Sequence, residues 1–295
     1  MPVICPLLSG ARRNSVRRSA ERCANYRAII RKKSISEITA KDIIRWQNQL
    51  LAMRDKNGQP YSPTYLKAIH NQLTAIFTHA FKFYGLKTNP ASKAGSVGKK
   101  HAEEMQFWTL DEYSRFAGVA VEDPIAFYAF EVLYWCGIRL GELLALTYED
   151  VNFENKTLRV NKSYTVVRGE EIISDPKTPK SKRTIIMPDF LIEELQEYTA
   201  FQYSPKPTDR VFKISKNYLR AHLRKNAELA GIKTIRVHDL RHSHVSHLIE
   251  LGFSPVAIAE RVGHESIEIT LRYAHLFPTK QSEMAAKLGE AARAL

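Results

Sequence analysis

Apolar residues recur with helical spacing along the first third of the chain. Thr39 is a candidate N-cap, and a helix is predicted from there to about Met53. The apolar positions of this segment lie three or four residues apart: Ile43, Trp46, Leu50 and Met53. Ser62 and Pro63 form a second helix-start signal, and this helix is predicted to end at Gly85. Two amphipathic helices are therefore expected before residue 86.

The second predicted helix has two different faces. Its apolar face, which we expect to be buried, consists of Leu66, Ile69, Leu73, Ile76, Ala80 and Tyr84. Another face carries small polar and basic side chains, namely Lys67, Asn71, Thr74 and Thr78. Side chains of this kind contact nucleic-acid phosphates, but they are equally typical of an ordinary solvent-exposed helix face. The pattern by itself leaves both interpretations open.

A change of composition separates these helices from the rest of the chain. Residues 86–105 are rich in Lys, Gly, Ser and Ala and show no apolar period, which predicts an interdomain linker. The segment WTLDEY follows, with a capping box formed by Thr109 and Glu112, and with Trp108 and Tyr113 at the spacing of a hydrophobic staple. Helices are then predicted at about 124–135 and from about Leu140.

Between residues 157 and 187 the apolar period becomes that of strands. TLRVNKSYTVV, EEIIS and RTIIMP are predicted strands, separated by RG and by DPKTPKSK, so we expect a small antiparallel sheet. Helical patterns resume at about 190–202, 215–230, 239–251, 255–262, 266–276 and 279–294. The predicted fold class is therefore mainly α with a small antiparallel β-sheet (α+β), in two domains.

Length and charge narrow the possible functions. A chain of 295 residues with 44% hydrophobic residues can form two domains that each bury a core. The net charge of +13 is uneven, because residues 1–33 carry +8, residues 34–105 carry +5, and the remaining 190 residues sum to zero. Within that neutral part, residues 206–241 hold ten basic and three acidic side chains. This distribution favours nucleic acid as a partner, although a basic stripe alone is more often a solvated surface.

Cysteine usage and hydropathy favour a cytoplasmic protein. The three cysteines have no close pairing, which indicates a reduced protein without disulfides or a zinc ribbon: Cys5, Cys23 and Cys136. The longest apolar stretch, residues 124–146, is interrupted by Glu131, Arg139 and Glu142, so no membrane span is predicted. The amino terminus lacks the features of a secretory signal, and residues 11–33 only loosely resemble an organellar presequence.

Four histidines lie close together in VHDLRHSHVSHLIELG, residues 237–252: His238, His242, His244 and His247. Their spacing does not match HExxH and no cysteine is near, so a zinc site is not predicted. Taken singly, a histidine is more often a core or surface residue than a functional one. Arg139 lies between two glycines beside an apolar run, where a guanidinium needs an anionic partner from the protein or from a ligand. Only the combination of these residues indicates function.

Four segments follow one another along the chain: CGIRLGELLALTYEDV, PKTPKSKRTIIMP, HDLRHSHVSHLIELG and LGFSPVAIAERVGHESIEITLRYAHL. They resemble the first arginine box, the lysine hairpin, the H-x-x-R box, and the Gly-His and tyrosine boxes of the tyrosine recombinases, the family of phage and conjugative-transposon integrases. The resemblance extends from about residue 34 to the carboxyl terminus. One such box is weak evidence, whereas four in order are specific.

The resemblance implies the catalytic set Arg139, Lys177, His238, Arg241, His264 and Tyr273. Tyr273 would attack a DNA phosphate and conserve the bond energy in a 3′-phosphotyrosyl link, so that rejoining needs no nucleotide cofactor. Arg139 and Arg241 would hold the non-bridging oxygens, and His264 would hydrogen-bond the phosphate. No cofactor and no metal are implied.

The resemblance assigns the two proton-transfer roles to the remaining members of that set. His238 would be the general base for the tyrosine, and Lys177 the general acid for the leaving 5′-oxygen, with Lys180 and Lys182 as close rivals. Asp239 is expected to cap or orient its helix. The remaining histidines are expected to be packing or surface residues: His242, His244 and His247.

The resemblance also implies a domain organisation. Residues 1–33 form a basic amino-terminal segment, 34–85 a SAM-like core-binding domain, 86–105 a linker, 106–278 the catalytic domain, and 279–295 a tail that docks on a neighbouring subunit or packs on its own domain. The implied partners are double-stranded DNA at core sites, a homo-tetramer on that DNA, and an excisionase or DNA-bending protein, in a bacterial cytoplasm at the nucleoid. Because residues 1–33 are short, we expect binding to core sites and not to arm sites.

Three functions are compatible with these residues. The first is a site-specific recombinase that integrates and excises mobile DNA. The second is a type IB topoisomerase, which shares the chemistry but relaxes supercoils without a partner site. The third is a DNA-binding protein of the same fold that no longer cuts, against which the filled catalytic positions argue.

Overall fold

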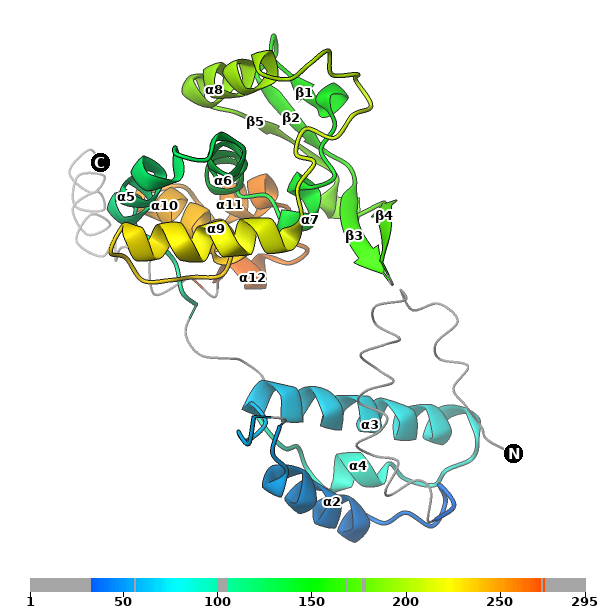
Figure 1. Ribbon diagram of the computed structural model, residues 1–295. Helices are drawn as coiled ribbons and strands as arrows, with labels where there is room; N and C mark the ends of the chain where they lie inside the picture. Colours follow the sequence, from blue (N-terminus) through cyan, green and yellow to red (C-terminus); the bar gives the residue numbers. More distant parts are fainter. Residues whose placement is uncertain are drawn as a thin grey trace, which may run out of the picture. The chain divides into compact units, whose positions relative to one another are not determined.

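The computed structural model describes residues 33–55, 57–99, 105–167, 169–176, 179–271 and 273 (Figure 1). The chain divides into two compact units, Met1–Glu104 and Met105–Leu295. Helices predominate in both, and the named strands all lie between Val151 and Ile186 of the second unit. The predicted α+β class is therefore confirmed. None of the described helices is both long and apolar enough to span a membrane.

The first unit begins with two helices at the predicted places. Helix α2 (Ala40–Ala52) starts at Thr39, whose side chain forms a capping box with Asp42. Helix α3 (Pro63–Phe83) is capped by Ser62 and is followed by a short helix α4 (Pro90–Lys93), which packs against it. Buried side chains of these helices and of the segments beside them form one core: Ile38, Ile43, Trp46, Leu50, Leu66, Ile69, Leu73, Phe77, Ala91 and Val97.

Two expectations for this unit need correction. Tyr84 is 65% exposed, because α3 ends at Phe83 and Tyr84 is already its C-cap; Phe77 occupies the core instead. Residues 86–105 are not wholly a linker, since they include α4 and since Ala91 and Val97 are buried in the unit's core. Isolated small apolar residues among Lys, Gly and Ser carry too little pattern for sequence analysis to detect this packing.

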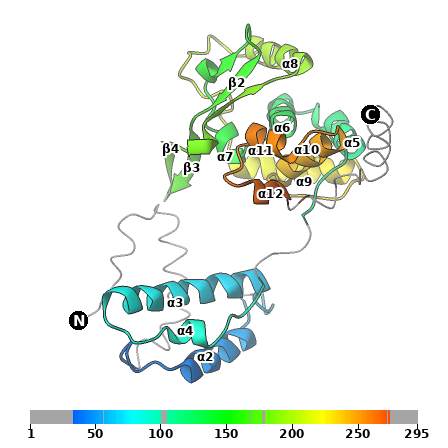
Figure 2. The same ribbon diagram turned by 180° about the vertical axis from the view of Figure 1, so that it is seen from behind.

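The second unit is built around helix α6 (Pro124–Cys136) (Figure 2). Most side chains of this helix are buried. Helices α5 (Leu110–Ala120), α8 (Asp189–Ala200) and α10 (Asp239–Glu250) pack against it. Helix α9 (Lys216–Leu229) packs on α5, while α11 (Pro255–Val262) packs on α10 and on the short α12 (Ile267–Leu271). The predicted helix at 279–294 lies outside the described residues.

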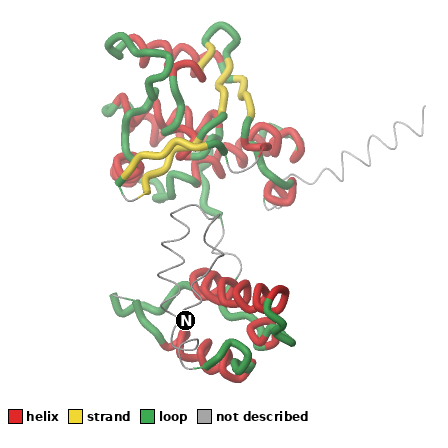
Figure 3. Tube along the Cα trace, turned by 90° about the vertical axis from the view of Figure 1, so that its right-hand side faces the viewer, coloured by secondary structure: helices red, strands yellow, loops and turns green. Residues whose placement is uncertain are grey.

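The strands form two small antiparallel sheets where sequence analysis predicted one (Figure 3). Strands β1 (Val151–Asn152), β2 (Thr157–Val160) and β5 (Arg183–Ile186) form one sheet in the order β1-β2-β5. Strands β3 (Ser163–Val167) and β4 (Glu170–Ser174) form a separate hairpin. The predicted strand 157–167 is divided because Asn161 and Lys162 leave the β2 ladder and turn toward a buried carboxylate.

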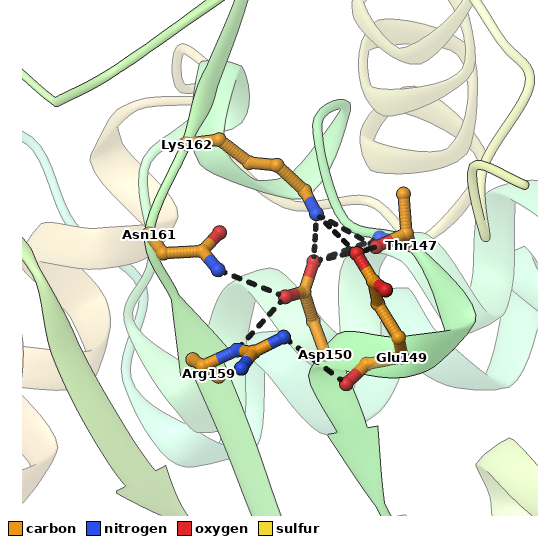
Figure 4. Close-up of polar contacts among 6 residues, drawn as sticks. All are labelled: Thr147, Glu149, Asp150, Arg159, Asn161 and Lys162. Atoms are coloured by element: carbon orange, nitrogen blue, oxygen red, sulfur yellow. Dashed lines mark hydrogen bonds and ion pairs between the residues drawn. The ribbon is translucent and has the colours of Figure 1, made fainter. Parts of the chain in front are cut away.

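That carboxylate belongs to Asp150, at the end of the 3-10 turn Tyr148–Asp150 (Figure 4). It accepts hydrogen bonds from Thr147 and Asn161, and it pairs with Lys162 at 2.7 Å and with Arg159 at 3.2 Å. Burial raises the pKa of Asp150, but the bonds from Lys162 and Thr147 outweigh burial and hold it below its usual value. The cluster ties the segment after α7 (Leu140–Leu143) to the starts of both sheets.

Candidate active site

The first part of the site is the turn between α6 and α7. Gly137 ends α6 in the left-handed region, with φ of 60°, and an added Cβ would collide with the ring of His244. Arg139 follows as the N-cap of α7. Its Nη1 lies 2.7 Å from Glu142 Oε1, and its Nη2 donates to the carbonyl of Gly263 at 3.3 Å. This partly exposed guanidinium is thus fixed between α7 and the turn that ends α11.

Arg241 contributes a second guanidinium from α10. Its side chain is only 3% exposed, and its Nη1 donates to the carbonyl of Gly137 at 2.8 Å. Its Nη2 is buried and has no hydrogen-bond partner among the described residues. Burial, and then the positive charges of Arg139 and Arg183, lower the pKa of Arg241 to about 9. A buried guanidinium nitrogen of this kind is costly unless an anion completes its bonding.

His264 lies beside these arginines, directly after α11. Gly263 ends α11 with φ of 67°, which turns the chain back toward β5. The Nδ1 atom of His264 shares a hydrogen bond of 2.8 Å with Thr270 Oγ1. Burial, followed by repulsion from Arg241 and Arg139, lowers the pKa of His264 to about 3. The ring is therefore neutral at physiological pH and can act as a hydrogen-bond donor through Nε2.

Tyr273 lies in the turn after α12 and is 2% exposed. Its ring packs in a small apolar cluster with Val245, Ile249, Ile258 and Val262. Its hydroxyl is hydrogen-bonded to Nδ1 of His242, and the two ring centroids lie 5.7 Å apart. His242 thus contacts the candidate nucleophile, whereas the sequence led us to expect a packing or surface residue at this position. The position of His242, one residue after Arg241, was the one feature of the sequence that could have indicated this contact.

The other three histidines of this segment have different surroundings. His238 is the N-cap of α10, remains exposed, and packs edge-on against His242 with ring centroids 5.1 Å apart. His244 is buried and accepts a hydrogen bond from Arg261 Nε at 3.2 Å, while His247 packs beside Trp135. Both were expected to be packing or surface residues. In the described part of the chain, no three His, Cys, Asp or Glu side chains gather as metal ligands.

The lysine hairpin is only partly described. Lys177 lies outside the described residues. Lys180 Nζ donates to the carbonyl of Glu265 at 3.2 Å, and Lys182 pairs with Asp175 at 3.1 Å. Both of these lysines are exposed. Lys180 therefore lies next to the turn that carries His264.

Each unit also has a shallow groove whose lining includes basic side chains. In the second unit the groove runs between α9 and residues 234–237 and is lined by Arg220, Arg224 and Arg236 among others. In the first unit it lies on α3 and is lined by Asn71, Thr74, Thr78, His79, Lys82 and Phe83. Thr74 and Thr78 point their hydroxyls at backbone carbonyls of their own helix. Asn71, His79 and Lys82 are the other polar side chains of this lining.

The amino-acid sequence is similar to those of known integrases. The profile described as "Phage integrase family" matches residues 107–280. The chain is 29% identical to the ICEBs1 integrase of Bacillus subtilis (strain 168), over 88% of this chain and 73% of that protein. It is 27% identical to the putative prophage phiRv2 integrase of Mycobacterium tuberculosis, over 78% of this chain and 63% of that protein.

Solved structures show the same fold. The Tn1549 transposon integrase in complex with a circular intermediate DNA has a TM-score of 0.76 and 18% identity, covering 96% of this chain and 95% of that one. A lambda integrase dimer bound to a COC′ core site has a TM-score of 0.63 and 17% identity, covering 90% of this chain and 89% of that one. At these identities the likeness concerns the fold alone.

Proposed function

Because the chain belongs to the phage integrase family, and is therefore a site-specific tyrosine recombinase that cleaves and rejoins DNA, we propose that Tyr273 is its nucleophile. The phenol oxygen attacks the scissile phosphorus, the bond to the 5′-oxygen breaks, and a 3′-phosphotyrosyl link conserves the bond energy. A 5′-hydroxyl from a second strand then reverses the step. The cleaved element is mobile DNA, as the names of the related integrases suggest.

The scissile phosphate binds between the two arginines. The observation that carries this proposal is the buried Nη2 of Arg241, which lacks a partner among the described residues and lies at a pair of mutually repelling guanidiniums. A phosphate oxygen would satisfy Nη2 and offset the repulsion between Arg241 and Arg139. Charge that develops on the non-bridging oxygens is stabilised by donors already in place, and one such donor contributes about 10²–10³-fold to the rate.

Two histidines complete the phosphate site in this proposal. His264, kept neutral by its surroundings, donates Nε2–H to a phosphate oxygen. His238, assigned as general base from the sequence, lies exposed at the start of α10 beside Arg241, and this position fits a contact with the phosphate or its sugar. The general acid remains Lys177, with Lys180 as the rival because it lies beside the His264 turn.

DNA contacts extend beyond the cleaved phosphate. The grooves that contain Arg220, Arg224 and Arg236 in one unit and Lys82 in the other would each follow a segment of phosphate backbone. A double-stranded core site bound by both units would explain why the positive charge is spread over both halves of the sequence. We further propose that four copies assemble on paired sites, with residues 279–295 as the docking tail; these residues lie outside the described part.

A covalent-trapping experiment tests the proposal. The core site is first selected from random-sequence duplexes by binding to the protein at low salt, and is then prepared with a nick that lets the cleaved fragment diffuse away. We expect a denaturant-resistant protein–DNA adduct with the wild type and none with Tyr273→Phe. Binding without an adduct would favour a DNA-binding protein that no longer cuts, whereas relaxation of supercoiled DNA without any core site would favour a topoisomerase.

A further inference from the structure

Tyr273 needs a proton acceptor, and its buried position limits which groups can take up the proton. The phenol proton has to leave when the oxygen bonds to phosphorus, and the side chain is 2% exposed, so bulk water has little access to it. The hydroxyl is hydrogen-bonded to Nδ1 of His242. His238, the histidine at the family's base position, instead lies exposed at the helix start and contacts the ring of His242.

We propose that His242 accepts the proton of Tyr273 and is a catalytic residue of the cleavage step, with Asp239 and Arg236 as positioning residues. The inference rests on the proposed function, because it assigns a role at the same nucleophile. It gives each member of the chain Arg236–Asp239–His242–Tyr273 a defined task.

Asp239 determines which nitrogen of His242 is free. Its carboxylate is 1% exposed, and Oδ1 lies 3.8 Å from His242 Nε2, one helical turn away on α10. This separation is too long for a hydrogen bond but suits an ion pair with a protonated ring. The negative charge favours a proton on Nε2 in the neutral ring, which leaves the lone pair of Nδ1 directed at the tyrosine hydroxyl.

Arg236 holds that carboxylate in place. Its Nη2 lies 2.7 Å from Asp239 Oδ1, and its Nε lies 2.9 Å from Oδ2, so the contact is bidentate. The backbone N–H of Arg236 also donates to Oδ2 at 2.8 Å. Asp239 therefore cannot rotate away from His242 without breaking several bonds. The expected role of Asp239 in orienting its helix thus extends to orienting a ring.

Burial and the nearby positive charges keep His242 unprotonated in the free enzyme. Burial lowers its pKa to about 4, and His238, Arg236 and Arg241 lower it as well, while Asp239 raises it. The ring is therefore neutral in the free enzyme. A phosphate bound at Arg241 would offset part of the cationic repulsion, so that the ring becomes a stronger base when the substrate is present.

The proton balance of the step is complete. The bond between Tyr273 Oη and phosphorus forms, and the bond between phosphorus and the 5′-oxygen breaks. The proton of Tyr273 moves to Nδ1 of His242, which becomes an imidazolium paired with Asp239. The leaving 5′-oxygen takes a proton from the general acid, for which Lys177 is the candidate, and reversal of both transfers rejoins the strand.

A pair of substrates separates the base from the acid. In a core-site duplex with a 5′-bridging phosphorothiolate, the leaving thiolate needs no proton, so loss of the general acid no longer slows cleavage. We expect His242→Ala to lower the rate of adduct formation about 10²–10⁴-fold on both substrates. Lys177→Ala should be slow only on the ordinary phosphodiester. Added imidazole should accelerate His242→Ala and not the wild type.

His242→Asn is the matched variant. Its amide can occupy the place of Nδ1 and bond to the hydroxyl, but it cannot take up a proton, so we expect a loss similar to that of His242→Ala with unchanged DNA affinity. Wild-type cleavage by His242→Asn would show that the residue only positions Tyr273 and would overturn the proposal. The proposal would also be overturned if His242→Ala cleaved the phosphorothiolate substrate at the wild-type rate. It would be overturned as well if His238→Ala, and not His242→Ala, were slow on both substrates.

The same assay separates this inference from the proposed function. If the wild type forms no adduct that Tyr273→Phe abolishes, the nucleophile itself is wrong and both proposals fail. If the wild type forms that adduct and the His242 variants cleave normally, only the assignment of the base fails.

Discussion

Arg183 Nη2 lies 3.0 Å from Glu142 Oε2, and both side chains are almost fully buried. This ion pair connects α7, whose N-cap is Arg139, to β5, the strand that follows the lysine hairpin. Glu142 also pairs with Arg139 at 2.7 Å through its other oxygen. Burial raises the pKa of Glu142, but Arg183 and Arg139 outweigh burial and hold it below its usual value. One carboxylate thus fixes two arginines of the site region.

Glu142→Gln should destabilise the second unit and slow cleavage. Removing one partner of a buried ion pair leaves the other charge uncompensated, which costs about 3–5 kcal/mol. The free energy of unfolding, measured by urea denaturation, checks the expectation. The control is Glu149→Gln, since Glu149 is partly exposed and its pair with Lys162 is 3.5 Å long, so its loss should cost at most about 1 kcal/mol. Equal effects of the two changes would contradict the role given to Glu142.

Gly263→Ala should reduce stability and cleavage more than Gly252→Ala, which introduces a similar backbone strain. Gly263 has φ of 67°, and an added Cβ would lie 3.0 Å from Arg183 Cδ and from the carbonyl of Lys180. Gly252 has φ of 84° but no atom within 4 Å of such a Cβ. Gly252→Ala should therefore cost only the left-handed backbone penalty, about 1–2 kcal/mol.

Because Gly263 also accepts a hydrogen bond from Arg139, we expect its alanine variant to lose cleavage activity in addition to stability. Parallel measurements of unfolding and of adduct formation for the two variants separate the contributions. If Gly252→Ala reduced cleavage as much as Gly263→Ala, crowding at the site would not be the cause.

Arg241→Lys should keep the positive charge and lose catalysis. A lysine cannot donate to the carbonyl of Gly137 and to a phosphate oxygen with the planar geometry of a guanidinium. We expect adduct formation to fall about 10²–10³-fold, the usual cost of one transition-state donor. Arg220→Lys, in the groove beside α9, should leave the cleavage rate of bound substrate unchanged. A wild-type rate for Arg241→Lys would argue against the proposed contact between the phosphate and Nη2 of Arg241.

The stability of the second unit should fall with acid between pH 6.5 and 4.5. The pKa of His264 is lowered to about 3 and that of His242 to about 4, so the unfolded chain binds protons that the folded chain excludes. Above pH 6.5 these histidines do not lower the free energy of unfolding, because they are neutral in both the folded and the unfolded chain. As the pH falls below 6.5, each histidine lowers the free energy of unfolding by about 1.4 kcal/mol per pH unit. Glu142 adds to the loss only at lower pH, whereas Glu194, whose pKa is raised by burial to about 7, offsets part of it.

Urea unfolding at several pH values measures this slope. His242→Asn should reduce it by the contribution of one histidine, because the variant has no ring to protonate. A slope identical to that of the wild type would mean that His242 does not resist protonation in the folded state.

Local signals predicted most helices of this protein well. The Thr39 and Thr109 capping boxes, Pro63 and Gly137 mark boundaries through backbone hydrogen bonding within a few residues, so they can be read from sequence. The linker prediction failed at Ala91 and Val97, because their burial depends on α2 and α3 and not on their neighbours in the chain. The division of the strands into two sheets likewise depends on a buried carboxylate that pattern does not reveal.

The sequence alone determined the places of the longer helices, the charge distribution and the boxes that contain Arg139, Arg241, His264 and Tyr273. Only the tertiary structure decided which of four neighbouring histidines meets Tyr273, and that Glu142 joins two arginines. The physical reason is that side chains on one helix point in different directions. Their partners come from segments tens of residues away, so only packing determines which histidine contacts the phenol.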